Sequence, residues 1–142
     1  MPDASATANG KKLRILIVED HGPTRIAMSR LIRQAGAEVT TARDGEEGLS
    51  LLLTQYFDVL LTDLRMPVMD GAGLWREVSA RHPSLARRML FVTGDTLSPD
   101  ATEFFKRSGC DGLDKPFAKA DLLAKVAALL QRRPASTGTR TP

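Results

Sequence analysis

Cysteines and long hydrophobic runs are scarce in this 142-residue sequence, and each scarcity excludes a class of protein. Cys110 is the only cysteine, which excludes an internal disulfide or a cysteine-clustered zinc site and is typical of a reducing compartment. The longest uninterrupted apolar run covers the five residues 126–130, too few for a membrane span or for the core of a signal peptide. The length suits one packed domain and not two, so we expect a single cytoplasmic domain with no membrane contact.

The chain lacks a net positive charge outside its two ends. Of the 20 basic residues, two lie in residues 1–12 and three in 131–142, together with one of the 17 acidic residues. Residues 13–130 therefore hold 15 basic and 16 acidic residues, so we expect no nucleic-acid partner. Both ends are rich in small polar residues and proline without apolar periodicity, which predicts flexible tails at 1–12 and 132–142 around one domain at 13–131.

Apolar runs and amphipathic stretches alternate five times between these tails. The runs predict strands at residues 13–18, 39–42, 57–62, 89–93 and 112–114. The amphipathic stretches predict helices at residues 23–34, 46–55, 72–80, 99–106 and 119–131. Ser98 suits the cap before one of these helices and Gly109 its C-terminal stop. This alternation requires crossover connections, so it predicts an α/β fold with a doubly wound, five-stranded parallel sheet. Of the two common strand orders we expect 2-1-3-4-5, because residues 15–18 are apolar throughout, as in a central strand, whereas residues 39–42 include threonines, as an outer strand can.

Polar residues follow the predicted strands at their carboxyl ends, which meet at one edge of a parallel sheet. They are Glu19 and Asp20 after the first strand, Asp63 after the third, Thr93 ending the fourth and Lys115 after the fifth. Taken singly, each is an ordinary cap, loop or surface residue. Together, each pair of carboxylates about 5 Å apart would repel by roughly 3 kcal/mol at an effective dielectric constant of about 20, so a cation should lie among them.

These residue types suit a hard cation and a phosphoryl group. Mg²⁺ prefers carboxylate oxygens, backbone carbonyls, waters and phosphate oxygens, and Lys115 adds a further positive charge. An aspartate can act as a nucleophile and form an acyl phosphate, and Asp63 is well placed for this because its strand is buried. Thr93 and Lys115 would then hold the phosphoryl oxygens by a hydrogen bond and by charge.

Four motifs, in order, resemble those of the receiver domain of bacterial two-component response regulators. They are ILIVED, LLTDLRMPVMDG, FVTGD and LDKPF, and the match covers residues 13–130. The resemblance implies a flavodoxin-like, three-layer sandwich. It also implies a signalling domain that catalyses only its own phosphorylation and dephosphorylation, and not a conventional enzyme.

The resemblance assigns roles to individual residues. It implies that Asp63 accepts a phosphoryl group from a histidine kinase or a histidine phosphotransfer protein. The implied Mg²⁺ ligands are Glu19, Asp20, Asp63 and the backbone carbonyl of Arg65. The implied phosphoryl-binding and switch residues are Thr93, Gly94 and Lys115. The implied loop-shaping residues are Pro67, Gly71, which is free to adopt a positive φ angle, and Pro116 after a cis peptide bond.

One departure from the family pattern affects the expected switch. Three residues before Lys115, where the family usually has Tyr or Phe, this sequence has Gly112. The hypothesis is therefore that phosphorylation remodels residues 94–98 more than the fifth strand. Phe104 and Phe105 are the rings that could substitute for the missing one.

Two other functions remain open at this point. An aspartate-nucleophile phosphatase also uses a strand-end aspartate, magnesium, a threonine and a lysine, but it needs a second aspartate where this chain has Arg65. A degenerate receiver would act as a constitutive interaction module. The expected context is a bacterial cytoplasmic protein, a stand-alone receiver or part of a hybrid kinase, acting on an unknown downstream protein as a monomer or weak dimer.

Overall fold

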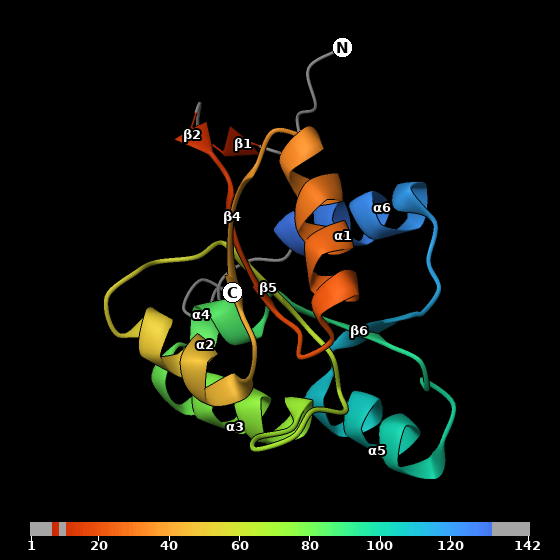
Figure 1. The fold of residues 1–142 in the computed structure, drawn as a ribbon. Coiled ribbons are helices and arrows are strands. Elements are labelled where there is room, and N and C mark those ends of the chain that lie inside the picture. The colour runs from red at the N-terminus through yellow and green to blue at the C-terminus, as the bar shows by residue number, and fades with distance from the viewer. Residues whose placement is uncertain (1–6, 9–10, 132–142) are drawn as a thin grey trace, which may run out of the picture.

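The computed structural model describes residues 7–8 and 11–131, and its centre is a five-stranded parallel sheet (Figure 1). The strands are β3 (Arg14–Val18), β4 (Glu38–Ala42), β5 (Val59–Thr62), β6 (Met89–Thr93) and β7 (Asp111–Asp114). Their order across the sheet is β4-β3-β5-β6-β7, with every neighbouring pair parallel. In chain order this is 2-1-3-4-5, so the predicted fold class and strand order are confirmed.

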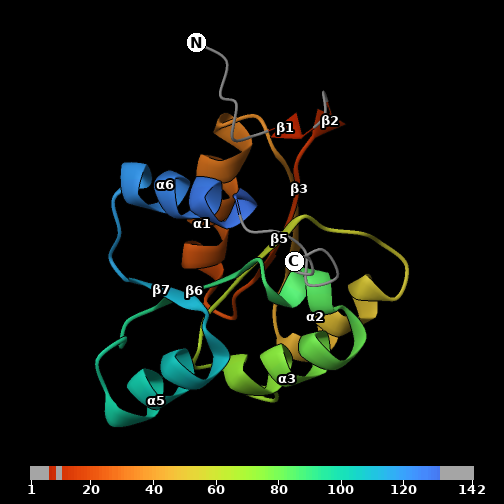
Figure 2. The ribbon, with the colours of Figure 1, turned by 180° about the vertical axis from the view of Figure 1, so that it is seen from behind.

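Helices cover both faces of the sheet and complete three layers (Figures 1 and 2). One face carries α1 (Gly22–Gln34) and α6 (Lys119–Leu130). The other carries α2 (Gly45–Leu52), α3 (Gly71–Arg81), α4 (Pro83–Ala86) and α5 (Pro99–Ser108). Successive strand residues point to opposite faces, so Ile15 and Ile17 pack in the first layer's core, while Leu16 and Val18 pack in the second.

Most element boundaries lie within a few residues of the predicted ones. The helix predicted to reach residue 55 ends earlier, at Leu52, because the next two amides bond to carbonyls only three residues back, as Thr54 does to Leu51. The strand predicted from residue 57 begins at Val59. The four-residue helix α4 was not predicted, since so short a segment shows no apolar periodicity.

The ends of α5 follow the predicted chemistry. The Ser98 hydroxyl accepts a hydrogen bond from the Ala101 amide at 3.2 Å, and Ser98 is the N-cap. Gly109 ends the helix with a φ angle of 74°. These two residues therefore fix where α5 begins and ends.

Two short strands lie in the segment predicted as the N-terminal tail. Strand β1 (Thr7–Ala8) pairs antiparallel with β2 (Lys11–Lys12), and this pair forms a sheet separate from the main one. The rest of that tail and the predicted tail at 132–142 lie outside the described residues, so the tails stay a prediction there. Among the described helices, none has the length and apolar character needed to cross a membrane.

Candidate functional site

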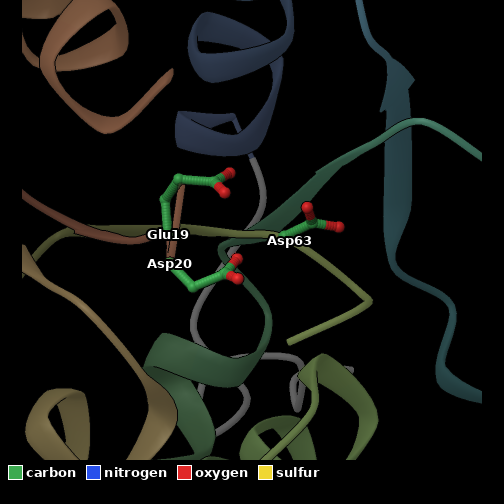
Figure 3. Close-up of side chains that lie close together, drawn as sticks. All are labelled: Glu19, Asp20 and Asp63. Atoms are coloured by element: carbon green, nitrogen blue, oxygen red, sulfur yellow. The ribbon is translucent and has the colours of Figure 1, made fainter. Parts of the chain in front are cut away.

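Three carboxylates meet where β3 and β5 end (Figure 3). Val18 and Thr62 are paired in register, so the residues that follow them leave the sheet at the same level. Glu19, Asp20 and Asp63 each offer a carboxylate oxygen, and these oxygens lie within 4.8 Å of one another. Glu19 and Asp63 are only 1% and 8% exposed, whereas Asp20 faces solvent. Two of the three charges are therefore withdrawn from water, which strengthens their interactions.

Lys115 supplies the cation that the cluster requires. Its ammonium lies 2.8 Å from Glu19 Oε1 and 2.8 Å from Asp63 Oδ2, donating a hydrogen bond to each. Burial acts to lower the pKa of Lys115, but hydrogen bonds from the amine to Asp63 and Glu19 and the charges of both carboxylates outweigh it, and the pKa is raised. The ammonium is therefore charged at neutral pH and holds together strand ends from three parts of the chain.

The hydroxyl of Thr93 is buried at the end of β6 without a hydrogen-bond partner among the residues that the structure describes. A buried, unsatisfied polar group costs about 1–3 kcal/mol, so an acceptor that reached this hydroxyl would be favoured. The Thr93 carbonyl accepts a hydrogen bond from the Lys115 amide at 2.8 Å, which places the two residues side by side. Gly94 follows as an exposed residue with open space around the position of a side chain.

The loop from β5 to α3 differs from its prediction in one respect. Gly71 does not use its freedom to adopt a positive φ angle, and Val68 has the positive angle in this loop, 70°. Glycine is required at position 71 for another reason, because a Cβ there would lie 2.5 Å from the carbonyl oxygen of Asp63. Pro67 lies in the turn, where its carbonyl accepts a hydrogen bond from the Met69 amide at 2.7 Å. At the other loop, the Lys115–Pro116 peptide bond is cis.

The position over Gly112 is occupied by a ring from another element. A Cβ built on Gly112 would lie 2.7 Å from Cζ of Phe105, a residue of α5. The Phe105 ring also meets Phe91 edge-on, with 6.0 Å between centroids. Phe104 is 3% exposed and belongs to the core. An aromatic ring therefore does lie at this place, but it comes from α5 and not from β7.

The side-chain contacts of Arg65 were missed by the sequence analysis. Its guanidinium donates a hydrogen bond to Ser98 Oγ at 3.1 Å and lies 3.5 Å from Asp95 Oδ2. Desolvation acts to raise the pKa of Asp95, but hydrogen bonds from Ser98 and the charge of Arg65 outweigh it, and the pKa is lowered. The only sequence signal was the role of Ser98 as a cap, because residues 65 and 95 share no local pattern.

The oxygen donors fit a hard divalent cation. Three carboxylates and one ammonium leave a net charge of −2 at a strand-end edge, and carboxylate oxygens are the ligands that Mg²⁺ takes in proteins. The Arg65 amide donates a hydrogen bond to Asp63 Oδ1 at 3.1 Å, so the peptide at Arg65 lies next to the same carboxylate. The arrangement can hold a cation and present Asp63 as a nucleophile beside an ammonium.

Comparison with known protein families gives one consistent match. The family described as "Response regulator receiver domain" matches residues 15–127. The transcriptional regulatory protein RprY of Bacteroides fragilis is 32% identical over 122 residues, which cover 86% of this chain and 51% of RprY. The DNA-binding transcriptional regulator NtrC of Klebsiella pneumoniae is 36% identical over 110 residues, 78% of this chain and 23% of NtrC. The chain thus spans about half or less of the length of these relatives.

Solved structures match the fold over nearly the whole of their chains. The chemotaxis response regulator CheY4 of Vibrio cholerae is 33% identical with a TM-score of 0.75, and the match covers 83% of this chain and 98% of CheY4. The receiver domain of the sensor histidine kinase PA1611 from Pseudomonas aeruginosa PAO1 is 30% identical with a TM-score of 0.74, covering 84% of this chain and 98% of that one. That receiver was solved with a magnesium ion coordinated in its active-site cleft.

Proposed function

Because this chain belongs to the family of response regulator receiver domains, which accept phosphoryl groups in two-component signalling, we propose that Asp63 is its phosphoacceptor. One observation carries the proposal. The Asp63 carboxylate is 8% exposed at a strand end and has the Lys115 ammonium 2.8 Å from one oxygen. Glu19 also contacts Lys115, but of the three clustered acids only Asp63 follows β5, the middle strand of the sheet.

The proposed reaction transfers a phosphoryl group from a phosphohistidine to Asp63. A bond forms between phosphorus and a carboxylate oxygen while the bond between phosphorus and the histidine nitrogen breaks. The donor ring, already protonated on its other nitrogen, leaves as neutral imidazole. The Lys115 ammonium offsets charge on the phosphoryl oxygens, and the Thr93 hydroxyl and the Gly94 amide donate hydrogen bonds to them.

We further propose that Glu19, Asp20, Asp63 and the backbone carbonyl of Arg65 hold a magnesium ion. When bound, the ion supplies positive charge beside the transferring phosphoryl group. Its presence would also reduce the repulsion among the three clustered carboxylates, whose oxygens lie within 4.8 Å of one another. Pro67, Gly71 and Pro116 shape the loops that present these groups.

The proposed function requires a phosphoryl donor and a downstream partner. The phosphoryl donor is a histidine kinase or a histidine phosphotransfer protein, and the output goes to a downstream protein through direct contact in the bacterial cytoplasm. Hydrolysis of an outside substrate is not part of the proposal, because Arg65 stands two residues after Asp63 and a guanidinium cannot act as the general acid that a phosphatase needs. The only reactions that the chain catalyses are then its own phosphorylation and dephosphorylation.

Intact-protein mass spectrometry after incubation with acetyl phosphate and Mg²⁺ tests the acceptor. We expect an adduct of one phosphoryl group that needs Mg²⁺, survives acid and is lost in base, as an acyl phosphate should be. Asp63→Asn is the control and should give no adduct. An adduct of equal size on Asp63→Asn would contradict the proposal.

Beryllium fluoride with Mg²⁺ provides a second test that needs no phosphodonor. Trp75 on α3 meets the Phe104 ring of α5 at 5.8 Å between centroids, so its fluorescence reports movement of α5. We expect a saturable change that is absent in Asp63→Asn. If neither acetyl phosphate nor beryllium fluoride has an effect, the chain is a degenerate receiver that works as a constitutive interaction module.

A further inference from the structure

The side chain of Arg65 connects the loop after β5 to the loop before α5. Arg65 lies two residues after the Asp63 carboxylate, and its guanidinium donates to Ser98 Oγ at 3.1 Å. The same nitrogen lies 3.5 Å from Asp95 Oδ2, and the other oxygen of Asp95 accepts the Ser98 amide at 3.0 Å. Arg65, Asp95 and Ser98 therefore form a closed set of contacts, which we call the Arg65 latch.

The latch acts on the start of α5 as well as on the loop. Ser98 Oγ, which receives the Arg65 hydrogen bond, also accepts the amide of Ala101 in the first turn of α5. A single oxygen thus joins the arginine to the helix cap. If the loop moved, Arg65 would have to follow it or release this oxygen.

The remaining contacts of the loop show where it is free to bend. On the side towards β7, the Thr96 hydroxyl donates a hydrogen bond to Asp114 Oδ1 at 2.9 Å. The Arg65 latch and the Thr96–Asp114 hydrogen bond thus hold the loop from residue 95 onward. Gly94 lies between Thr93 and this held part, is exposed, and would have no atom within 4 Å of a Cβ. Gly94 is the point at which Thr93 can turn while the anchored part of the loop resists.

We propose that Arg65 is a positioning residue whose latch holds residues 95–98 and the start of α5 in the arrangement seen here, and that a phosphoryl group on Asp63 must compete with it. This inference rests on the proposed function of Asp63. The buried Thr93 hydroxyl gains an acceptor when a phosphoryl group arrives, and turning toward it pulls on residues 94–98. Because the latch bonds form only in the present arrangement, they favour it over any arrangement in which the loop has moved.

Two substitutions distinguish the latch from a simple effect of charge. The latch predicts that both change the affinity for beryllium fluoride in the same direction, whereas charge alone predicts opposite changes. If Arg65 only attracts the anionic ligand, Arg65→Gln weakens binding of beryllium fluoride and Asp95→Asn strengthens it. If the latch opposes the switch, both variants strengthen binding, because each removes the ion pair between Arg65 and Asp95. The double variant then binds no more tightly than Arg65→Gln alone, since that substitution already removes every latch contact of Arg65.

The experiment is a titration of the full chain with beryllium fluoride at saturating Mg²⁺, followed by Trp75 fluorescence. The Arg65 and Asp95 side chains are about half exposed, and exposed ion pairs contribute little, so we expect a gain in affinity of roughly two- to fivefold for Arg65→Gln and for Asp95→Asn. Arg65→Lys should lie between Arg65→Gln and the parent, because an ammonium restores part of the contact. Arg81→Gln is the matched control, since Arg81 makes a comparably exposed ion pair with Glu77 on α3 away from the site.

Each outcome separates the latch from the proposed function. Affinity equal to the parent in both variants, or a loss in Arg65→Gln beside a gain in Asp95→Asn, overturns the latch and leaves Asp63 as acceptor. A parent that shows no response to beryllium fluoride, and no acyl phosphate with acetyl phosphate, overturns the proposed function instead. A gain of similar size in Arg81→Gln would also overturn the latch, because it would show that loss of any surface arginine has this effect.

Discussion

Gly71 and Gly94 lie in the segments that follow β5 and β6, but they place opposite demands on a side chain. A Cβ at Gly71 would lie 2.5 Å from the Asp63 carbonyl oxygen and 2.7 Å from the Leu64 Cα, both backbone atoms that cannot rotate away. A Cβ at Gly94 would meet nothing within 4 Å. The chain at the start of α3 therefore passes so near the backbone of Asp63 that only glycine fits at residue 71, whereas residue 94 is open.

We expect Gly71→Ala to destabilise the protein by about 2–3 kcal/mol, since overpacking against fixed atoms forces backbone shifts. Gly94→Ala should change the free energy of unfolding by less than about 1 kcal/mol because its surroundings are open. Urea unfolding of both variants beside the parent measures the difference. Equal stability of the two alanine variants would show that the loop can move away from Asp63 at little cost.

At the scale of elements, the Phe105 ring of α5 contacts β7. Phe105 lies over Gly112, and it meets Phe91 on the neighbouring strand and Phe104 on its own helix. The absence of a side chain at residue 112 and the presence of this ring are therefore complementary. At this point α5 packs on the edge strand through the Phe105 ring, which contacts the backbone of Gly112.

We expect Gly112→Ala to cost about 1–2 kcal/mol, because the new methyl group would lie 2.7 Å from Phe105 Cζ and the ring must shift. In a Phe105→Leu background the same change should cost less than half as much, since the smaller side chain leaves room. Chemical denaturation of the four proteins in this double-mutant cycle measures the coupling. Additive effects would mean that the ring does not occupy the space over Gly112 in solution.

At the scale of the whole molecule, Lys115 joins strand ends that are distant in sequence. Its contacts to Glu19 and Asp63 span 96 and 52 residues. The amine thereby links the loop after β7 to the ends of β3 and β5, across the middle of the sheet. These contacts contribute to holding the sheet edge together.

This link gives the stability a predictable dependence on pH. The folded pKa of Lys115 is raised, although burial alone would lower it, because hydrogen bonds to Asp63 and Glu19 and their charges favour the ammonium. The stabilisation is therefore fully present below the unfolded pKa of about 10.4 and is lost as the pH rises through the higher folded pKa. We expect the difference in unfolding free energy between the parent and Lys115→Gln, measured in EDTA, to be constant from about pH 8 to 9.5 and to shrink above about pH 10.5. A difference that shrinks below about pH 9 would contradict the raised pKa.

Local pattern was enough to predict much of the architecture and the members of the candidate site. Alternating apolar runs and amphipathic stretches predicted the parallel α/β sheet, and the composition of the first two strands favoured the strand order. The rule that parallel strands present their carboxyl ends at one edge predicted that Glu19, Asp63 and Lys115 lie together. The end of α2 at Leu52 and the four-residue α4 were not predictable, because three-residue turns and single-turn helices leave too few residues for a periodic signal.

The sequence by itself determined the class of fold and the chemistry at the strand ends, because both follow from the pattern of residues along the chain. Only the tertiary structure decided three other features: the close approach behind Gly71, the Phe105 ring over Gly112 and the Arg65 latch. Each depends on a distance between segments far apart in sequence, and such distances are fixed by how helices pack on the sheet. A glycine in the sequence shows that a side chain is missing, and the fold shows which atom takes its place.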